Sequence, residues 1–249
     1  MTLVRALSFS ALVFLLASIA DSAPPTGEGW QPLFSGKDLS GWKVPQGDGG
    51  HWKVVDGVID YDARSEAKGD KNLWTEKSYQ DFVLHIEWRI NETHGKYPLK
   101  VILPGGSYKK GPDGKDIVMP TPNADSGVFL RGQGKSQVNI WCWPVGSGEV
   151  WGYRNDKKQP AETRAAVVPK VKADKPVGEW NTFEITMQGD VLNVQLNGKQ
   201  VIENARLVGI PKEGPLALQH HGGYNEKTGQ YNAASSLVQF RNIYIKELD

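Results

Sequence analysis

Apolar and polar residues alternate along most of this chain, which is the pattern of β-strands that are half buried in a core. In the clearest run, residues 81–90, one face carries Phe82, Leu84, Ile86, Trp88 and Ile90. The other face of that run carries Val83, His85, Glu87 and Arg89. Further alternating runs cover 180–188, 191–195, 199–203, 215–220 and 237–248. Asn197-Gly198 predicts a type I′ hairpin, and a phase shift near Arg241-Asn242 predicts a β-bulge.

The runs are short and are separated by Gly, Pro, Asn and Asp, without helical periodicity. This pattern predicts an all-β fold, either a sandwich of two antiparallel sheets or a barrel. Residues 91–123 and 155–178 are rich in Lys, Pro and small residues, and we expect them to be long loops. Loops of this length are commonly functional, and each could wall a cleft.

The first residues have the features of a secretory signal peptide: Arg5, the apolar stretch 6–20, and a small-x-small site ending at Ala20. Cleavage after Ala20 or after Ser22 fits equally. We therefore expect a signal peptide over 1–22, one β-sandwich domain over 23–249, and export to the periplasm or the extracellular space. The net charge is +1, which gives no basic field for nucleic acid, and no later segment is long and apolar enough to span a membrane.

Residues 136–144 combine amides with indoles on one face of a predicted strand. Val138, Ile140 and Cys142 point toward the core, so the opposite face carries Gln137, Asn139, Trp141 and Trp143. Flat apolar rings beside paired donors and acceptors suit sugars, which have hydroxyls at the rim and C–H groups on the face. Alternatively, the tryptophans only cover a sheet edge or pack under a loop.

The polar face of 81–90 offers His85, Glu87 and Arg89. Ordinary glycosidases use two carboxylates about 5 to 9.5 Å apart, and Glu87 has no carboxylate partner on its own strand. His85 and Glu87 could hold a divalent cation together with His220, or His85 could simply be satisfied by a neighbouring carboxylate. Because His220 and His221 are adjacent on a predicted strand, they should face opposite sides.

The segment 123–131 is a predicted turn that enters a strand, with Asp125, Gly127, Phe129 and Arg131 on one side. Gly127 leaves room for a ligand or a backbone to approach. Arg131 could bind an anionic oxygen, or it could order the sheet through an ion pair with Asp125 or Glu87. Acyl and phosphoryl transfer have no support, because neither a Gly-x-Ser-x-Gly motif nor a phosphate-binding glycine loop is present.

Eight short motifs, taken in order, make the chain resemble the 3-keto-disaccharide hydrolase family. The motifs are WQPLFSGKDLSGW from Trp30, WKVVDG from Trp52, DFVLHIEWR from Asp81, DSGVFLR from Asp125, GEWN from Gly178, LNG from Leu196, LQH from Leu218 and FRNI from Phe240. Each motif is modest alone, but their order is specific, and together they span nearly the whole mature chain.

The resemblance implies a concanavalin-A-like jelly roll that cleaves 3-keto-glycosides, by hydrolysis or by 1,2-elimination followed by hydration. A ketone at C3 acidifies the proton on C2, so one base and one group that stabilises the enolate suffice. We expect Glu87 or His85 to act as the base or as a ligand of a divalent cation, and Arg131 or the bound cation to stabilise the enolate. As substrate-binding residues we add Arg89, Asp125, Gln137, Asn139, Trp141, Trp143, Tyr153 and His220.

Two positions depart from the family pattern. Gln137-Val-Asn139 stands where the family usually has Glu-x-Gln, and Asp125-Ser-Gly127 stands where it usually has Asn-Ser-Gly. The change could relocate a charge, alter the substrate, or leave a carbohydrate-binding module without turnover. In every case we expect Glu87, Arg131, Asn139 and Trp141 to converge in one open cleft.

Overall fold

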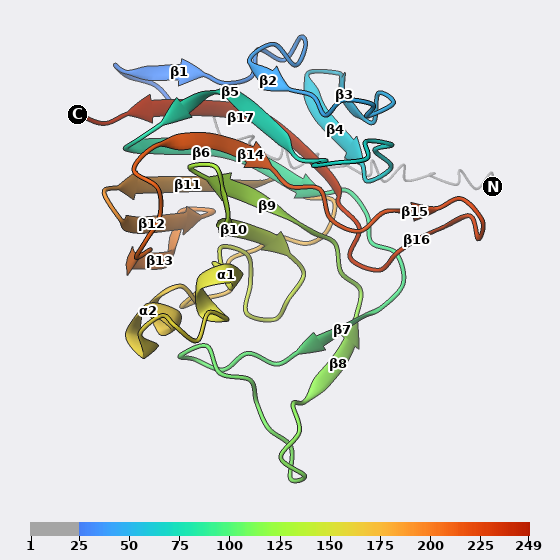
Figure 1. Cartoon of the computed structure of the whole chain (residues 1–249), viewed down its shortest axis with the longest axis vertical. Coiled ribbons are helices and arrows are strands. Elements are labelled where there is room, and N and C mark those ends of the chain that lie inside the picture. Colours follow the sequence, from blue (N-terminus) through green and yellow to red (C-terminus); the bar gives the residue numbers. More distant parts are fainter. Residues whose placement is uncertain (1–24) are drawn as a thin grey trace, which may run out of the picture.

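The computed structural model describes residues 25–249, so the expected signal peptide lies outside the described residues. Two antiparallel sheets pack face to face in a jelly-roll sandwich, as the alternation predicts (Figure 1). Within residues 25–249, no helix has the length and apolar character needed to cross a membrane.

The larger sheet has eight strands in the order β13-β12-β11-β6-β17-β4-β3, with β1 paired to β17. Its strands are β1 (Trp30–Pro32), β3 (Trp52–Val55), β4 (Val58–Asp62), β6 (Phe82–Ile90), β11 (Asn181–Gln188), β12 (Val191–Leu196), β13 (Lys199–Arg206) and β17 (Leu237–Glu247). Asn197 and Gly198 both have positive φ between β12 and β13, which confirms the type I′ hairpin. The register of β17 against β6 shifts between Arg241 and Tyr244, which confirms the predicted bulge.

The smaller sheet has five strands in the order β10-β9-β14-β5-β2. They are β2 (Trp42–Lys43), β5 (Leu73–Tyr79), β9 (Asp125–Leu130), β10 (Gln133–Trp141) and β14 (Gly214–Leu218). Val128, Val138 and Leu218 face inward and join the core that β6 and its neighbours provide from the other sheet. The sandwich thus has two outer faces, which point in opposite directions.

The long segment 91–123 is not a plain loop, as we expected, but an arm that contains β7 (Tyr97–Lys100) and β8 (Val118–Thr121). These strands pair with each other and project beyond the sandwich (Figure 1). Segment 155–178 likewise contains a short helix, α2 (Ala161–Ala166), and α1 (Trp151–Arg154) precedes it beside β10. A further hairpin, β15 (Tyr224–Asn225) with β16 (Gln230–Tyr231), follows β14.

Candidate functional site

A pocket of about 480 Å³ lies on the outer face of the five-stranded sheet. Strands β9 and β10 and the residues just after β14 form its floor, and the arm and α1 form its walls. The predicted residues that line it are Asp125, Gln137, Asn139, Trp141 and Trp143. The polar face of 136–144 therefore does border a cavity.

The floor of the pocket is built from side-chain amides that cross the strands. Gln137 donates from Nε2 to the carbonyl of Ser126 at 3.0 Å and to Oε1 of Gln219. A Cβ at Gly127 would lie 2.4 Å from that Nε2, so only glycine there lets the Gln137 side chain lie flat across β9. The space that Gly127 leaves is thus filled by an amide of the protein itself.

Asp125 and His221 are the titratable groups that line this floor, and one serine ties their backbones together. Ser236 donates from Oγ to the carbonyl of Asp125 at 2.6 Å, and its Oγ accepts from the backbone N–H of His221 at 2.7 Å. The backbone N–H of Ser236 also donates to the carbonyl of His221. The segment that precedes β17 therefore fixes both residues relative to each other.

Burial raises the pKa of Asp125 to about 6, although the nearby His221 opposes the shift. A carboxyl group with this pKa carries its proton in about half of the molecules at pH 6 and in about a tenth at pH 7. It can therefore act as a general acid, which an ordinary solvated aspartate cannot do efficiently.

Two adjacent histidines are each fixed through a hydrogen bond at Nδ1. His221 Nδ1 lies 2.8 Å from the carbonyl oxygen of Ala234, which can only accept, so Nδ1 carries a proton and Nε2 is the acceptor nitrogen of the neutral ring. His220 Nδ1 lies 2.5 Å from the hydroxyl of Tyr61 and shares a hydrogen bond with it. In its neutral form, His221 thus has a basic nitrogen left for the pocket.

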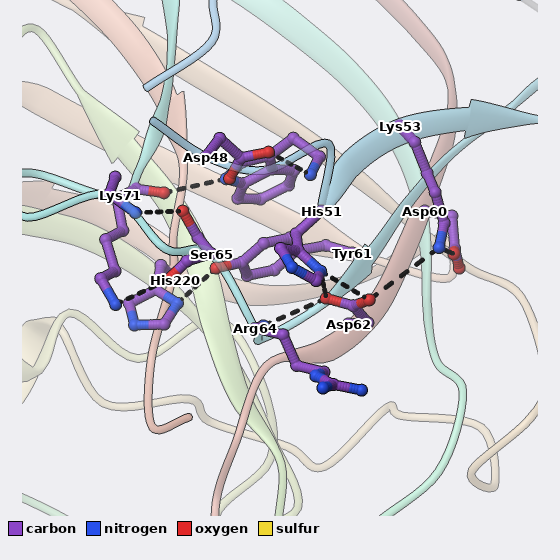
Figure 2. A network of polar contacts seen from close by, with 12 residues as sticks. Asp48, His51, Lys53, Asp60, Tyr61, Asp62, Arg64, Ser65, Lys71 and His220 are labelled. Carbon is purple, nitrogen blue, oxygen red and sulfur yellow. Dashed lines mark hydrogen bonds and ion pairs between the residues drawn. The ribbon is translucent and has the colours of Figure 1, made fainter. Parts of the chain in front are cut away.

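His220 is not a pocket residue, which corrects our prediction. It belongs to a polar network around Tyr61 that joins β4 to the loop residues Asp48, Ser65 and Lys71 (Figure 2). Burial and the charge of Lys71 lower its pKa to about 4. The two histidines do face opposite sides, as predicted, but the one in the pocket is His221.

Trp141 and Trp143 border the pocket without being exposed plates. Their rings stack on each other with centroids 4.3 Å apart, and only 3% and 7% of their surfaces are exposed. Leu99 of the arm packs with them in a small separate core. Most of their surface is therefore packed under a loop, which is the alternative that we named for these tryptophans. The two indoles form the surface on which the arm packs.

His85, Glu87 and Arg89 lie on the other exterior of the molecule, because β6 belongs to the eight-stranded sheet. Glu87 is only 1% exposed and accepts a hydrogen bond of 2.6 Å from Nε of Arg241. Arg89 donates to Gln239, which in turn donates to Asp60. The prediction that Glu87 and Arg131 converge with Asn139 and Trp141 is wrong, because the outer faces of two packed sheets point apart.

The predicted pair of metal ligands, His85 and Glu87, gains no further ligand. Among the described residues, no three His, Cys, Asp or Glu side chains gather in a way that could hold a metal ion. Burial lowers the pKa of His85, which keeps its imidazole neutral on the sheet surface.

Arg131 and Tyr153 are structural. Alternation ends with Leu130, and Arg131 has a φ of 50°, which turns its side chain into the protein. There it donates to the carbonyls of Gln80, Gly189 and Pro211 and pairs with Asp81 at 2.8 Å. Tyr153 is fully buried, and its hydroxyl donates to the carbonyl of Leu207.

The pocket is also lined by residues that we did not predict as site residues: Tyr97, Lys100, Tyr108, Phe129, Trp151, Gln219 and His221. For Gln219 and His221 a signal was available. Leu216 and Leu218 face inward, so the same alternation sends residues 217, 219 and 221 outward. For the residues of the arm and of Trp151 no such periodicity exists.

Comparison with known proteins agrees with this architecture. Residues 29–246 match the family model of the 3-keto-alpha-glucoside-1,2-lyase-like domain. Among curated proteins, none matches the chain. Two similar solved structures are candidate glycosyl hydrolases from Parabacteroides distasonis. One is 20% identical, with a TM-score of 0.57 and coverage of 98% of this chain and 100% of that chain. The other is 21% identical, with a TM-score of 0.54 and coverage of 91% and 99%. A match over this span of the chain establishes its family: the protein belongs to the 3-keto-alpha-glucoside-1,2-lyase-like domain family.

Proposed function

We propose that this protein is an exported enzyme that cleaves 3-keto-α-glucosides by 1,2-elimination and hydration in the pocket on the five-stranded sheet. The observation that carries the proposal is that Asp125, whose pKa is raised to about 6, lies in the same pocket as His221, whose Nδ1 bonds Ala234 and so leaves Nε2 as the acceptor of the neutral ring. Both line one pocket that has an amide floor. The elimination needs a base for C2, and an acid for the leaving oxygen accelerates it; different environments fit the two groups to these roles.

In the first half of the reaction, Nε2 of His221 takes the proton from C2 of the keto-sugar. The side-chain amides of Asn139 and Gln219, which line the same pocket, donate to the developing enolate oxygen on C3. The C1–O bond then breaks, its electrons stay with the leaving oxygen, and a double bond forms between C1 and C2. Asp125 gives its proton to the departing oxygen.

In the second half, water adds across the new double bond and both groups return to their starting states. Asp125, now ionised, takes a proton from the water that attacks C1. His221 returns its proton to C2. A positioned acid or base typically contributes about 10²- to 10⁴-fold to such steps, so two of them with an enolate site suffice for an enzyme.

The test uses maltose that has been oxidised at C3 of its non-reducing ring. We expect the purified protein to release glucose from it, and in D₂O the keto-sugar product should carry deuterium at C2. Glucose release without deuterium at C2 would replace elimination with direct hydrolysis. No release from a sugar that binds would overturn the enzymatic proposal.

The second candidate function is a carbohydrate-binding module on the same pocket. The observation that favours it is Gln137: an amide stands where the family motif usually has a glutamate, and it is engaged by Ser126 and Gln219. This alternative predicts that the keto-disaccharide binds and is recovered intact.

A further inference from the structure

We infer that the pocket has a second subsite, in which the exposed indole of Trp151 stacks on a second ring of the substrate. The inference rests on the proposed function and extends it: the substrate is a two-ring glycoside, whose leaving ring lies on Trp151.

Trp151 is the exposed aromatic side chain of this pocket. Half of its surface, 50%, is exposed, whereas Trp141 and Trp143 at the same pocket are nearly covered. A large exposed indole at the rim of a polar cavity provides the flat surface for sugar C–H groups that the sequence predicts for Trp141 and Trp143.

The backbone position of Trp151 is fixed by the residues that follow it. Gly152 packs so closely on β10 that a Cβ there would lie 2.4 Å from the carbonyl oxygen of Lys135. Tyr153 is buried and bonded to Leu207, and buried Arg154 pairs with Glu149. With the rest of α1 anchored, the helix cannot turn Trp151 inward. A rigid backbone that already presents the indole to the pocket reduces the loss of freedom on binding, which favours affinity.

Lys100 and Arg154, two cations near this end of the pocket, each have a partner within the protein. Lys100, which lines the pocket, pairs with Asp116 at 2.9 Å and lies over the ring of Tyr108. Arg154, whose guanidinium also lies over Tyr108, is paired with Glu149. Because Asp116 also pairs with Lys110, one carboxylate serves two lysines, and the indole of Trp151 rather than an absence of charge defines this subsite.

The size of the cavity agrees with two rings. Asp125 and His221 lie at its floor and Trp151 lies on α1 at its wall, within a total volume of about 480 Å³. One ring over the floor leaves space toward Trp151 for another. The glycosidic oxygen would then lie between the two subsites, where Asp125 has to protonate it.

The experiment compares a two-ring and a one-ring substrate in the wild type, Trp151→Ala and Trp151→Phe. For 3-keto-maltose we expect Trp151→Ala to raise KM about tenfold with little change in kcat, and Trp151→Phe to stay near the wild type. For methyl 3-keto-α-glucopyranoside, which has no second ring, all three proteins should have the same KM. Equal effects on both substrates, or no effect on either, would overturn the subsite.

A binding measurement separates this inference from the proposed chemistry. In calorimetric titrations with unoxidised maltose and methyl α-glucopyranoside, Trp151→Ala should weaken only maltose, again about tenfold. If the wild type binds maltose in this way but does not cleave 3-keto-maltose, the subsite stands and the enzymatic proposal fails. If Trp151→Ala does not weaken maltose, or the wild type does not bind it, the subsite fails. Thermal melts should coincide, because the substituted side chain is half exposed.

Discussion

The two outer faces of the sandwich carry similar polar residues and use them differently. The face of the eight-stranded sheet has His85, Glu87 and Arg89, and the face of the five-stranded sheet has Asp125, Gln137 and Asn139. On the first face the charges have partners within the protein: Glu87 bonds Arg241, and the guanidinium groups of Arg89 and Arg241 both lie over the ring of Trp180. On the second face Asp125 is kept in an environment that opposes its ionisation.

This difference shows how a carboxylate for stability is distinguished from a carboxylate for chemistry. A paired acid such as Glu87 stabilises the fold. Burial of Asp125 costs free energy when the group is ionised, and the same burial raises its pKa toward the range in which a carboxyl group can donate a proton. The residue types do not separate the two faces, but the partners and the covering segments do. The arm and α1 cover the second face and wall its pocket.

The largest expected effect is the loss of turnover in Asp125→Asn, by about 10²- to 10⁴-fold with 3-keto-maltose, because the leaving oxygen loses its acid. A nitrophenyl 3-keto-α-glucoside, whose leaving group needs no proton, should lose much less. The matched control is Glu184→Gln on the other face, which is exposed and should leave turnover unchanged. Equal losses on both substrates would show that Asp125 is not the acid.

The same residue sharpens the comparison through pH. The acid form of Asp125 is lost as pH rises through about 6, so kcat/KM for 3-keto-maltose should fall above this pH. The double variant Asp125→Asn, Gln137→Glu has the usual family residues at these two positions. We expect it to regain part of the activity that Asp125→Asn alone loses. A double variant no better than Asp125→Asn would contradict a relocated acid.

Glu87→Gln should give the opposite result: normal turnover per folded molecule and lower stability. The change removes the charge that Arg241 faces at 2.6 Å, in a site where Glu87 is 1% exposed. We expect a loss of about 2 kcal/mol in the free energy of unfolding, measured by denaturant titration. Lost turnover with unchanged stability would return Glu87 to the list of catalytic candidates.

His220 should make stability depend on pH. Its folded pKa of about 4 lies below the unfolded value, so the unfolded state takes up its proton first and stability falls as pH drops from about 6.5 toward 4. We expect His220 to account for about 1–2 kcal/mol of that loss, and His220→Asn to reduce it while keeping an acceptor for Tyr61. If the wild type and His220→Asn lose the same free energy of unfolding between pH 7 and pH 4.5, the prediction is wrong.

The smallest effect concerns the stability of Asp125→Asn itself. Because the folded pKa of Asp125 is raised, its contribution to stability is full below the unfolded pKa and is lost as pH rises through about 6. At pH 7.5 the neutral asparagine should therefore raise the free energy of unfolding by about 1 kcal/mol. A destabilised variant would mean that the Asp125 carboxylate is compensated in the fold after all.

The alternation of the sequence predicted the sandwich well, since burial forces a period of two wherever one face of a strand meets the core. It predicted the hairpin at Asn197 and the bulge after Arg241 for the same local reasons. It also gave the inward or outward direction of Gln137 and Asn139 correctly. These features depend on neighbours in the chain.

The site was only half predicted, because alternation tells inside from outside but not which sheet a strand joins. Glu87 and Asn139 both face outward, yet they lie on opposite exteriors. The inward direction of Arg131 was not predicted because its left-handed backbone breaks the alternation. The place of Trp151 in the pocket was not predicted because a four-residue helix has no periodic pattern. These facts follow from strand order and tertiary packing.

The arm between β6 and β9 has a consequence for how relatives of this protein could diversify. It leaves one sheet at Ile90 and enters the other at Asp125, so its residues pair with neither sheet over most of their length. Changing its length or sequence would reshape one wall of the pocket and leave Asp125, His221 and Ser236 undisturbed. Grafting arms of different lengths onto this scaffold is thus a direct route to new substrate preferences with the same proton-transfer machinery.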